Sequence, residues 1–195
     1  MDELVDHLAE ALEAVDPLVA GIDEHQWSRS TPCTRWSVRD LVEHVVGGHQ
    51  MFADIVRGAP TPSPEERGPT GGLGVDPLGT YRAAAYDVLA AFGEPGVLTT
   101  SFTLPTGSVP GVAAVHLRIV EALGHGWDLA RATGQTIQVR DRIAELALDF
   151  SAQLLTGLPR GPGPFAPPQA VAVDAPVLER LAALLGRRTG SAPPG

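Results

Sequence analysis

Residues 110–134 read PGVAAVHLRIVEALGHGWDLARATG, and this stretch predicts a long helix around which the rest of the chain is organised. Pro110 suits a first helical turn, where its missing N–H would have no partner. Gly134 suits the left-handed residue that ends a helix. Glu121 and His125 are four residues apart, so at about 100° per residue they lie on one face, one turn apart. One helix can therefore offer two ligands to a single metal ion.

A third ligand must come from another element, and His44 is the best candidate. It lies in SVRDLVEHVVGGH, residues 37–49, whose apolar spacing predicts a second helix that begins at Ser37. Ser37 and Asp40 resemble a capping box. Two imidazoles and one carboxylate suit a divalent ion, with Zn²⁺ first and Ni²⁺ or Fe²⁺ as alternatives. Three protein ligands leave one coordination position open for water or substrate, as in catalytic sites.

The spacing of Glu121 and His125 also fits a helix without metal, since such pairs occur as surface hydrogen bonds. The immediate neighbours of Glu121 are apolar, which disfavours an unpaired carboxylate there. Both interpretations stay open on spacing alone. No residue can be assigned a catalytic role from the sequence.

Three other side chains are candidates for supporting roles. Asp128 leans toward the His125 ring and either orients it through its second N–H or forms a structural link to an Arg or Trp. Arg118 either anchors an anionic substrate or pairs with an acid of the first helix, which we favour. Cys33, near the start of the second helix, is a nucleophile candidate, but a buried structural role is favoured.

The remaining histidines point away from this face. His49 lies about 140° round the helix from His44, and His116 has the same offset from Glu121. For these two, and for His7 and His25, we expect solvent exposure or a structural hydrogen bond. A glycine pair, 47–48, is costly within a helix at roughly 1 kcal/mol each, so it predicts a bend or the close approach of another element.

The rest of the chain predicts helices joined by Pro/Gly-rich loops at 58–76 and 157–170. Pro17 should kink or break the first helix near Asp16, and Trp27 and Trp36 should cover one end of the core. Further helices are expected at 2–22, 77–91, 139–155 and 175–187, with an extended crossover at 97–109. We expect an all-α fold: a four-helix bundle with additional C-terminal helices, in one domain over 1–187, followed by a disordered tail at 188–195.

Composition excludes several classes of function. The net charge of −9 and the pI near 5.0 argue against nucleic acid and anionic membrane as partners. The sequence has no lysine, which excludes a Schiff-base or P-loop lysine. Its single cysteine excludes an intrachain disulfide, and no apolar run approaches the roughly 18 residues of a membrane span. With no signal peptide evident, we expect a cytoplasmic protein.

Two segments, TPCTRWSVRDLVEHVVGG at 31–48 and RIVEALGHGWDLARATGQ at 118–135, resemble the mycothiol-dependent maleylpyruvate isomerase N-terminal family. This family belongs to the DinB-like superfamily, and the resemblance is closest to a subgroup of short metal-binding proteins from high-GC bacteria. It implies a DinB-like four-helix bundle with a divalent metal near one end. The family's ligands match His44, Glu121 and His125 position by position.

Characterised relatives of this family use mycothiol or bacillithiol in isomerisation or S-transfer, so the resemblance implies a thiol cosubstrate and a small electrophile. The maleylpyruvate isomerases carry an additional C-terminal domain for which this sequence has no room, so we do not expect the maleylpyruvate reaction itself. The resemblance also allows a homodimer. Our leading interpretation is a metal-dependent thiol transferase or isomerase. The alternative from another class is a non-catalytic metal-binding or ligand-sensing module.

Overall fold

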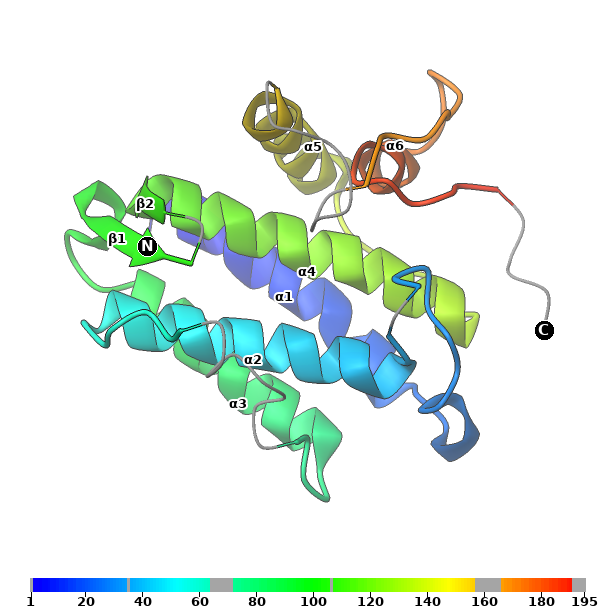
Figure 1. Cartoon of the computed structure of the whole chain (residues 1–195), viewed down its shortest axis with the longest axis horizontal. Coiled ribbons are helices and arrows are strands. Elements are labelled where there is room, and N and C mark those ends of the chain that lie inside the picture. The colour runs from blue at the N-terminus through cyan, green and yellow to red at the C-terminus, as the bar shows by residue number, and fades with distance from the viewer. Residues whose placement is uncertain (1, 35, 64–71, 106, 157–165, 191–195) are drawn as a thin grey trace.

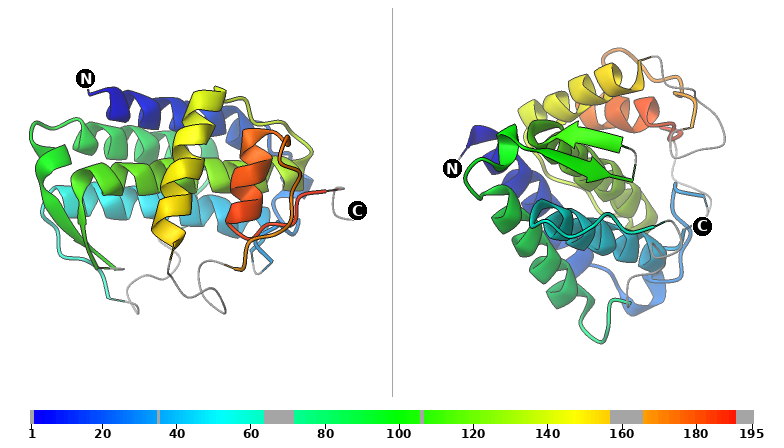
Figure 2. Two further views of the ribbon diagram at one scale, coloured as in Figure 1. Left: turned by 90° about the horizontal axis from the view of Figure 1, so that it is seen from above. Right: turned by 60° about the vertical axis from the view of Figure 1, so that its left-hand side comes forward.

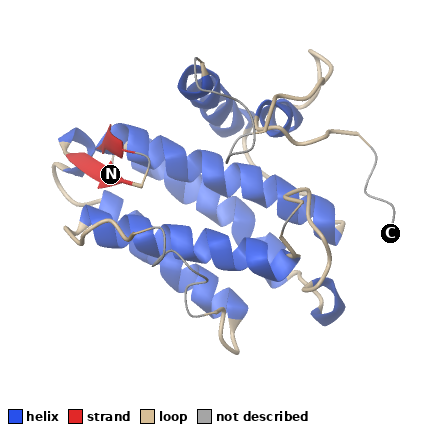
Figure 3. Cartoon of the chain, in the orientation of Figure 1, coloured by secondary structure: helices blue, strands red, loops and turns tan. Residues whose placement is uncertain are grey.

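The computed structural model describes residues 2–34, 36–63, 72–105, 107–156 and 166–190, and helices dominate these ranges (Figure 1 and Figure 3). Its α-helices are α1 (Glu3–Ala20), α2 (Val38–Val56), α3 (Pro77–Phe92), α4 (Gly111–Thr133), α5 (Asp141–Leu155) and α6 (Val177–Leu184). Its shorter elements are the 3-10 turns η1 (Glu24–Gln26) and η2 (Val97–Thr99) and the strands β1 (Ser101–Leu104) and β2 (Gly107–Pro110). The predicted all-α class is confirmed.

The first four helices form the bundle. In it α1 packs against α3 and α4, and α2 packs against the same two helices. The two C-terminal helices pack on each other and on α4, and they run across the bundle rather than along it (Figure 2). A bundle with additional C-terminal helices, as expected, is therefore what the structure shows.

Local sequence signals explain where these helices begin and end. The side chains of Asp2 and Asp76 accept hydrogen bonds from the first turns of α1 and α3. Ser37 and Asp40 form the predicted capping box at the start of α2. Gly134 ends α4 with a φ of 74°, as predicted. These caps satisfy backbone groups that a helix leaves unpaired at its ends.

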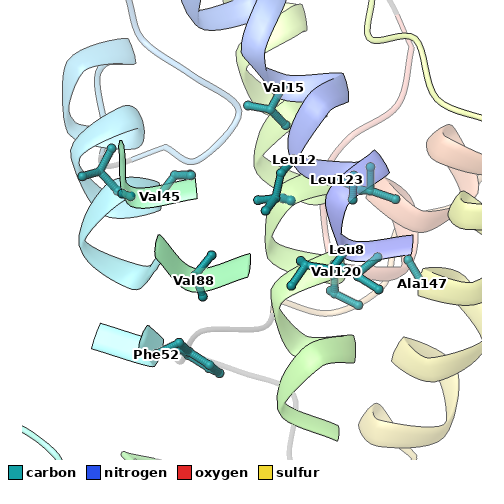
Figure 4. Close-up of a cluster of buried hydrophobic side chains, with 14 of the residues drawn as sticks. Leu8, Leu12, Val15, Val45, Phe52, Val88, Val120, Leu123 and Ala147 are labelled. Carbon is teal, nitrogen blue, oxygen red and sulfur yellow. The ribbon is translucent and has the colours of Figure 1, made fainter. Parts of the chain in front are cut away.

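The core lies between the bundle helices. Figure 4 shows side chains of this core, which come from the bundle helices and from α5: Leu8, Leu12 and Val15 of α1, Val45 and Phe52 of α2, Val88 of α3, Val120 and Leu123 of α4, and Ala147 of α5. All of them are buried. Their burial stabilises the bundle and sets the distance between α2 and α4, which matters for the site described below.

The structure corrects three local expectations. The helix α1 continues through Pro17 to Ala20, so a break near Asp16 is wrong; the proline removes one backbone donor, and the remaining hydrogen bonds keep the helix continuous. Residues 97–109 form η2 and a hairpin rather than an extended crossover, with Gly107 supplying a φ of 122° at the turn. Pro110 lies at the N-cap position of α4, just before the helix, instead of in its first turn.

Several expectations fall outside the described residues, at least in part. They are the disordered tail at 188–195, of which 191–195 are not described, and parts of the loops at 58–76 and 157–170. Among the helices that are described, none combines the length and hydrophobicity needed to cross a membrane.

Candidate metal centre

His44, Glu121 and His125 meet between α2 and α4. The Nε2 atom of His44 lies 3.2 Å from the Oε2 atom of Glu121, and the Nε2 atom of His125 lies 3.4 Å from the same oxygen. The three donor atoms all lie within 4.8 Å of one another. Helical periodicity places Glu121 below His125, and core packing brings His44 across from α2. The structure thus brings together the three residues that the sequence singled out.

The spacing of these donors fits a divalent ion. Zn–N and Zn–O distances of 2.0–2.2 Å at tetrahedral angles put neighbouring donor atoms about 3.3 Å apart. The side chains of His44 and Glu121 are 39% and 32% exposed, whereas that of His125 is 7% exposed. A cation held here would therefore be anchored on the buried imidazole and open to solvent on the other side.

The electrostatics of the cluster favour a cation. Burial raises the pKa of Glu121, but the charge of His125, hydrogen bonds from both imidazoles and the charge of Arg118 outweigh it and hold that pKa well below its usual range. Burial lowers the pKa of His125, but the charge of Glu121 and hydrogen bonds to Asp128, Cys33 and Glu121 raise it well above its usual range. Both directions favour a positive charge between His125 and Glu121, where a proton and a metal ion would compete.

Asp128 holds the other side of the His125 ring. Its Oδ2 atom lies 3.1 Å from the His125 Nδ1 atom, so the ring N–H at Nδ1 donates to the carboxylate and Nε2 is left facing Glu121. Asp128 is fully buried and also accepts two hydrogen bonds from Arg187, at 2.8 Å and 3.2 Å. The hydrogen bonds that the two roles considered for Asp128 require, one with the imidazole and others with an arginine, are all present.

Cys33 lies on the same side of His125. Its thiol donates to Asp128 Oδ2 at 3.2 Å and accepts from Arg187 Nη2 at 3.3 Å, and its sulfur is 4.0 Å from His125 Nδ1. It is half-buried, not fully buried as favoured from the sequence. Cys33, His125 and Asp128 also have metal-ligand spacing, but the guanidinium of Arg187 already supplies the cation there. This second cluster is therefore a buried ion-pair network.

The segment between α1 and α2 covers this end of the bundle, and Figure 1 shows it crossing beside the C-terminal half of α4. It is tied there by Gln26, whose Nε2 donates to the backbone carbonyl of Thr133 at 3.0 Å. Trp36 lies over the centre, with its ring 4.3 Å from that of His44 and 5.7 Å from that of His125. Trp27 and Trp36 both pack against the core, as predicted.

Arg118 is buried one turn before Glu121 on α4. Its Nη2 atom lies 3.2 Å from Nδ1 of His49, and its guanidinium stacks on Phe52. It makes no ion pair with α1, whose residues are all described, so the favoured pairing with an acid of that helix is wrong. A Cβ atom at Gly48 would lie 3.0 Å from Arg118 Nη1, which explains the glycine predicted to allow a close approach.

The other histidines lie away from the centre. His49 is fully buried and makes the predicted structural hydrogen bond, to Arg118. His25 is exposed, and His7 lies 3.8 Å from Glu3 on the same helix. His116 stacks on Phe150. None of the four belongs to the His44 cluster.

Sequence reasoning missed Arg187 entirely and missed the contacts of Cys33. Arg187 lies beyond α6, more than fifty residues from Asp128, and no local pattern connects the two. Cys33 was singled out for its place near the start of the second helix rather than for contact with Asp128. Both contacts depend on how α6 and the segment between α1 and α2 pack against α4, and a single sequence carries no direct signal of that packing.

Comparisons with known proteins show the family to which the chain belongs. The family model "Mycothiol maleylpyruvate isomerase N-terminal domain" matches residues 8–130, which include all three proposed ligands and Asp128. Two similar relatives are uncharacterized proteins of Mycobacterium tuberculosis, Rv0738 of strain H37Rv and MT0763 of strain CDC 1551. Each is 36% identical over 188 residues, which cover 96% of this chain and 98% of the relative.

Solved structures show the same fold. The crystal structure of the mycothiol-dependent maleylpyruvate isomerase superposes with a TM-score of 0.65 at 17% identity, covering 80% of this chain and 69% of that one. A histidine-to-alanine mutant of that enzyme gives the same TM-score and identity, with coverage of 82% and 73%. With its bundle, its sequence match and this structural likeness, the chain belongs to the mycothiol maleylpyruvate isomerase N-terminal domain family.

Proposed function

We propose that this protein binds a divalent metal ion, Zn²⁺ in the first place and Ni²⁺ or Fe²⁺ as alternatives, through His44, Glu121 and His125. We further propose that it is an enzyme that uses a mycothiol-type thiol on a small electrophile, by S-transfer or isomerisation. One observation carries the proposal: three donors from two helices converge at metal-ligand spacing, with one side open to solvent.

The residues of the centre divide the work. Glu121 and His125 supply two ligands from one rigid helix, and Asp128 keeps the Nε2 atom of His125 directed at the cation position. The ring of Trp36 packs over both imidazoles and limits their rotation. A divalent ion held there would lower the pKa of a thiol that takes its open position, which makes the sulfur a better nucleophile.

The exposure of the centre favours an enzyme over a purely structural metal site. Structural zinc sites are closed by four protein ligands. Here the group within ligand distance among the described residues has three members, and two of them are about one-third exposed. A non-catalytic ligand-sensing module is the second candidate, since an open coordination position also suits a reversibly bound ligand.

Metal analysis tests the first part of the proposal. The full chain is purified without a His tag and without chelators, and its metal content is measured beside His44→Ala and the matched control His25→Ala, which changes an exposed histidine. We expect about one equivalent of metal in the wild type and in His25→Ala, and a large loss in His44→Ala. Equal metal content in all three proteins would reject the site.

Turnover tests the second part. The metal-loaded protein is incubated with mycothiol and a bimane electrophile, and thioether formation is followed by fluorescence. We expect a rate above that of His44→Ala. A protein that binds metal tightly but shows no rate above this control would instead be the binding or sensing module.

A further inference from the structure

The segment that follows α6 returns to the metal centre. Arg187 donates from Nη2 to Asp128 Oδ2 at 2.8 Å and from Nε to Asp128 Oδ1 at 3.2 Å, a two-pronged pair with a fully buried carboxylate. Its side chain is only 12% exposed. Burial lowers the pKa of Arg187, but its hydrogen bond and ion pair with Asp128 outweigh this and raise it, so the pair stays charged.

The chain around Arg187 is built to aim it inward. Gly186 has a φ of 91° and packs on Ala166, so the backbone turns sharply just after α6. The backbone N–H of Arg187 donates to the carbonyl of Ala182 at 2.9 Å, and its Nη1 donates to the carbonyl of Leu185 at 3.1 Å. Hydrogen bonds at the backbone and at Nη1 thus hold Arg187 in place beside Asp128.

The fit between α6 and α4 brings Arg187 within reach. A Cβ atom at Gly124 would lie 3.1 Å from Leu185 Cδ1, so the glycine beside His125 lets the end of α6 approach α4 closely. Leu185 is buried in this contact. The approach puts Arg187 beside Asp128 on the side of His125 opposite Glu121.

We propose that Arg187 is a positioning residue for the metal centre, which rests on the proposed function above. It fixes the carboxylate of Asp128, which in turn holds Nδ1 of His125 and keeps Nε2 directed at the cation. Arg187 lies outside the matched region of residues 8–130. The chain beyond the family domain therefore contributes to the centre through a chain of contacts from Arg187 to Asp128 to His125.

The two hydrogen bonds explain why an arginine occupies this position. A lysine ammonium is a point charge without the planar fork that matches both carboxylate oxygens. The simple alternative is that Arg187 only fastens α6 to the bundle. That role would change stability but not the intrinsic metal affinity of the folded protein, so the two roles have different readouts.

The experiment measures Zn²⁺ affinity on the full chain by competition with a chromophoric chelator. The variants are Arg187→Gln, Arg187→Lys and the matched control Arg188→Gln, which changes an exposed arginine. We expect Arg187→Gln to bind Zn²⁺ about tenfold more weakly, within the range typical of residues that orient a ligand. Arg187→Lys should fall between Arg187→Gln and the wild type, and Arg188→Gln should match the wild type.

A double-mutant cycle identifies the route of the effect. If Arg187 acts through Asp128, adding Arg187→Gln to Asp128→Asn should weaken Zn²⁺ binding no further. Circular dichroism and thermal unfolding of the metal-free variants show whether they are folded at the assay temperature, and Arg187→Lys carries the test if Arg187→Gln is not.

Three results would overturn the inference. One is Zn²⁺ binding by folded Arg187 variants equal to the wild type, and another is an undiminished loss in the Asp128→Asn background. In both cases the metal site itself stands. If the wild-type chain binds no Zn²⁺, the proposed function fails first and the positioning role fails with it.

Discussion

Two buried histidines of this bundle, His125 on α4 and His49 on α2, have opposite surroundings. His125 lies among acids, with Glu121 on one ring nitrogen and Asp128 on the other. His49 lies beside the buried guanidinium of Arg118, and its Nε2 atom has no hydrogen-bond partner. Their exposed fractions are similar, at 7% and 0%. Burial alone therefore does not explain what each histidine does.

The pKa values of the two imidazoles move in opposite directions. Burial lowers both, because a low-dielectric environment disfavours the charged form. At His125 the charge of Glu121 and the hydrogen bond to Asp128 reverse this effect and raise the pKa. At His49 the charge of Arg118 adds to it, and the pKa falls well below 6.5.

This difference shows that the neighbours decide whether a buried histidine attracts a cation. The acids around His125 favour a proton or a metal ion between it and Glu121. The cation beside His49 keeps that ring neutral, so that its Nδ1 accepts from Arg118. In our proposal His125 is a metal ligand, whereas His49 links α2 to α4 through its hydrogen bond with Arg118.

Replacing each of the two histidines in turn and measuring Zn²⁺ affinity is the sharpest test of this comparison. His125→Asn should weaken Zn²⁺ binding by more than about 100-fold, beyond the range for residues that only orient a ligand, because it removes an anchoring donor. His49→Leu should leave the affinity within a few-fold of the wild type. Chelator competition measures both, and a loss of equal size in His49→Leu would contradict the division of roles.

The second prediction concerns the stability of the metal-free protein. His49→Leu should lower the free energy of unfolding by about 1–3 kcal/mol, because Arg118 loses its acceptor while buried. Adding Arg118→Met should cost less than the sum of the two single changes, since both polar partners are then gone. Urea denaturation in the presence of a chelator measures this, and strictly additive losses would show that the two residues do not act as a pair.

The third and smallest effect is on the pH dependence of stability. His125, whose folded pKa is raised above 6.5, contributes stability that is fully present below that pH and is lost as pH rises through the folded value. His49, whose folded pKa is lowered, contributes stability that is present above pH 6.5 and is lost as pH falls toward the folded value.

Urea denaturation of the chelated protein between about pH 5 and about pH 9 separates the two histidines. His125→Asn should flatten the stability profile on the alkaline side, and His49→Leu should flatten it on the acid side. If both variants flattened the stability profile on the same side, the opposite pKa shifts of the two histidines would be contradicted. Zn²⁺ affinity of the wild type should rise with pH, because the metal must displace a proton from His125.

Local patterns predicted much of the fold and part of the centre. Helical periodicity placed Glu121 and His125 on one face, and in the structure the Oε2 atom of Glu121 lies 3.4 Å from the Nε2 atom of His125. The capping box at Ser37 and the end of α4 at Gly134 were also correct. These features depend on residues within one or two turns of each other, which is the range over which a sequence dictates its own geometry.

Contacts between distant segments were the weak point. Arg118 was expected to pair with an acid of α1 and instead bonds to His49 of α2. Spacing on one helix says which way a side chain points, but not which neighbouring helix it meets. The hairpin at β1 and β2 was missed for a related reason, since short strands are stabilised by pairing that a single segment does not reveal.

The sequence by itself determined the helices, their caps and the pairing of an acid with a histidine one turn apart, because these depend on backbone periodicity and nearby side chains. Only the tertiary structure decided that His44 comes within 3.2 Å of Glu121 and that Arg187 reaches Asp128 from beyond α6. Both contacts depend on how closely α2 and α6 pack against α4. That packing is set by the whole buried core together, and no single stretch of the chain encodes it.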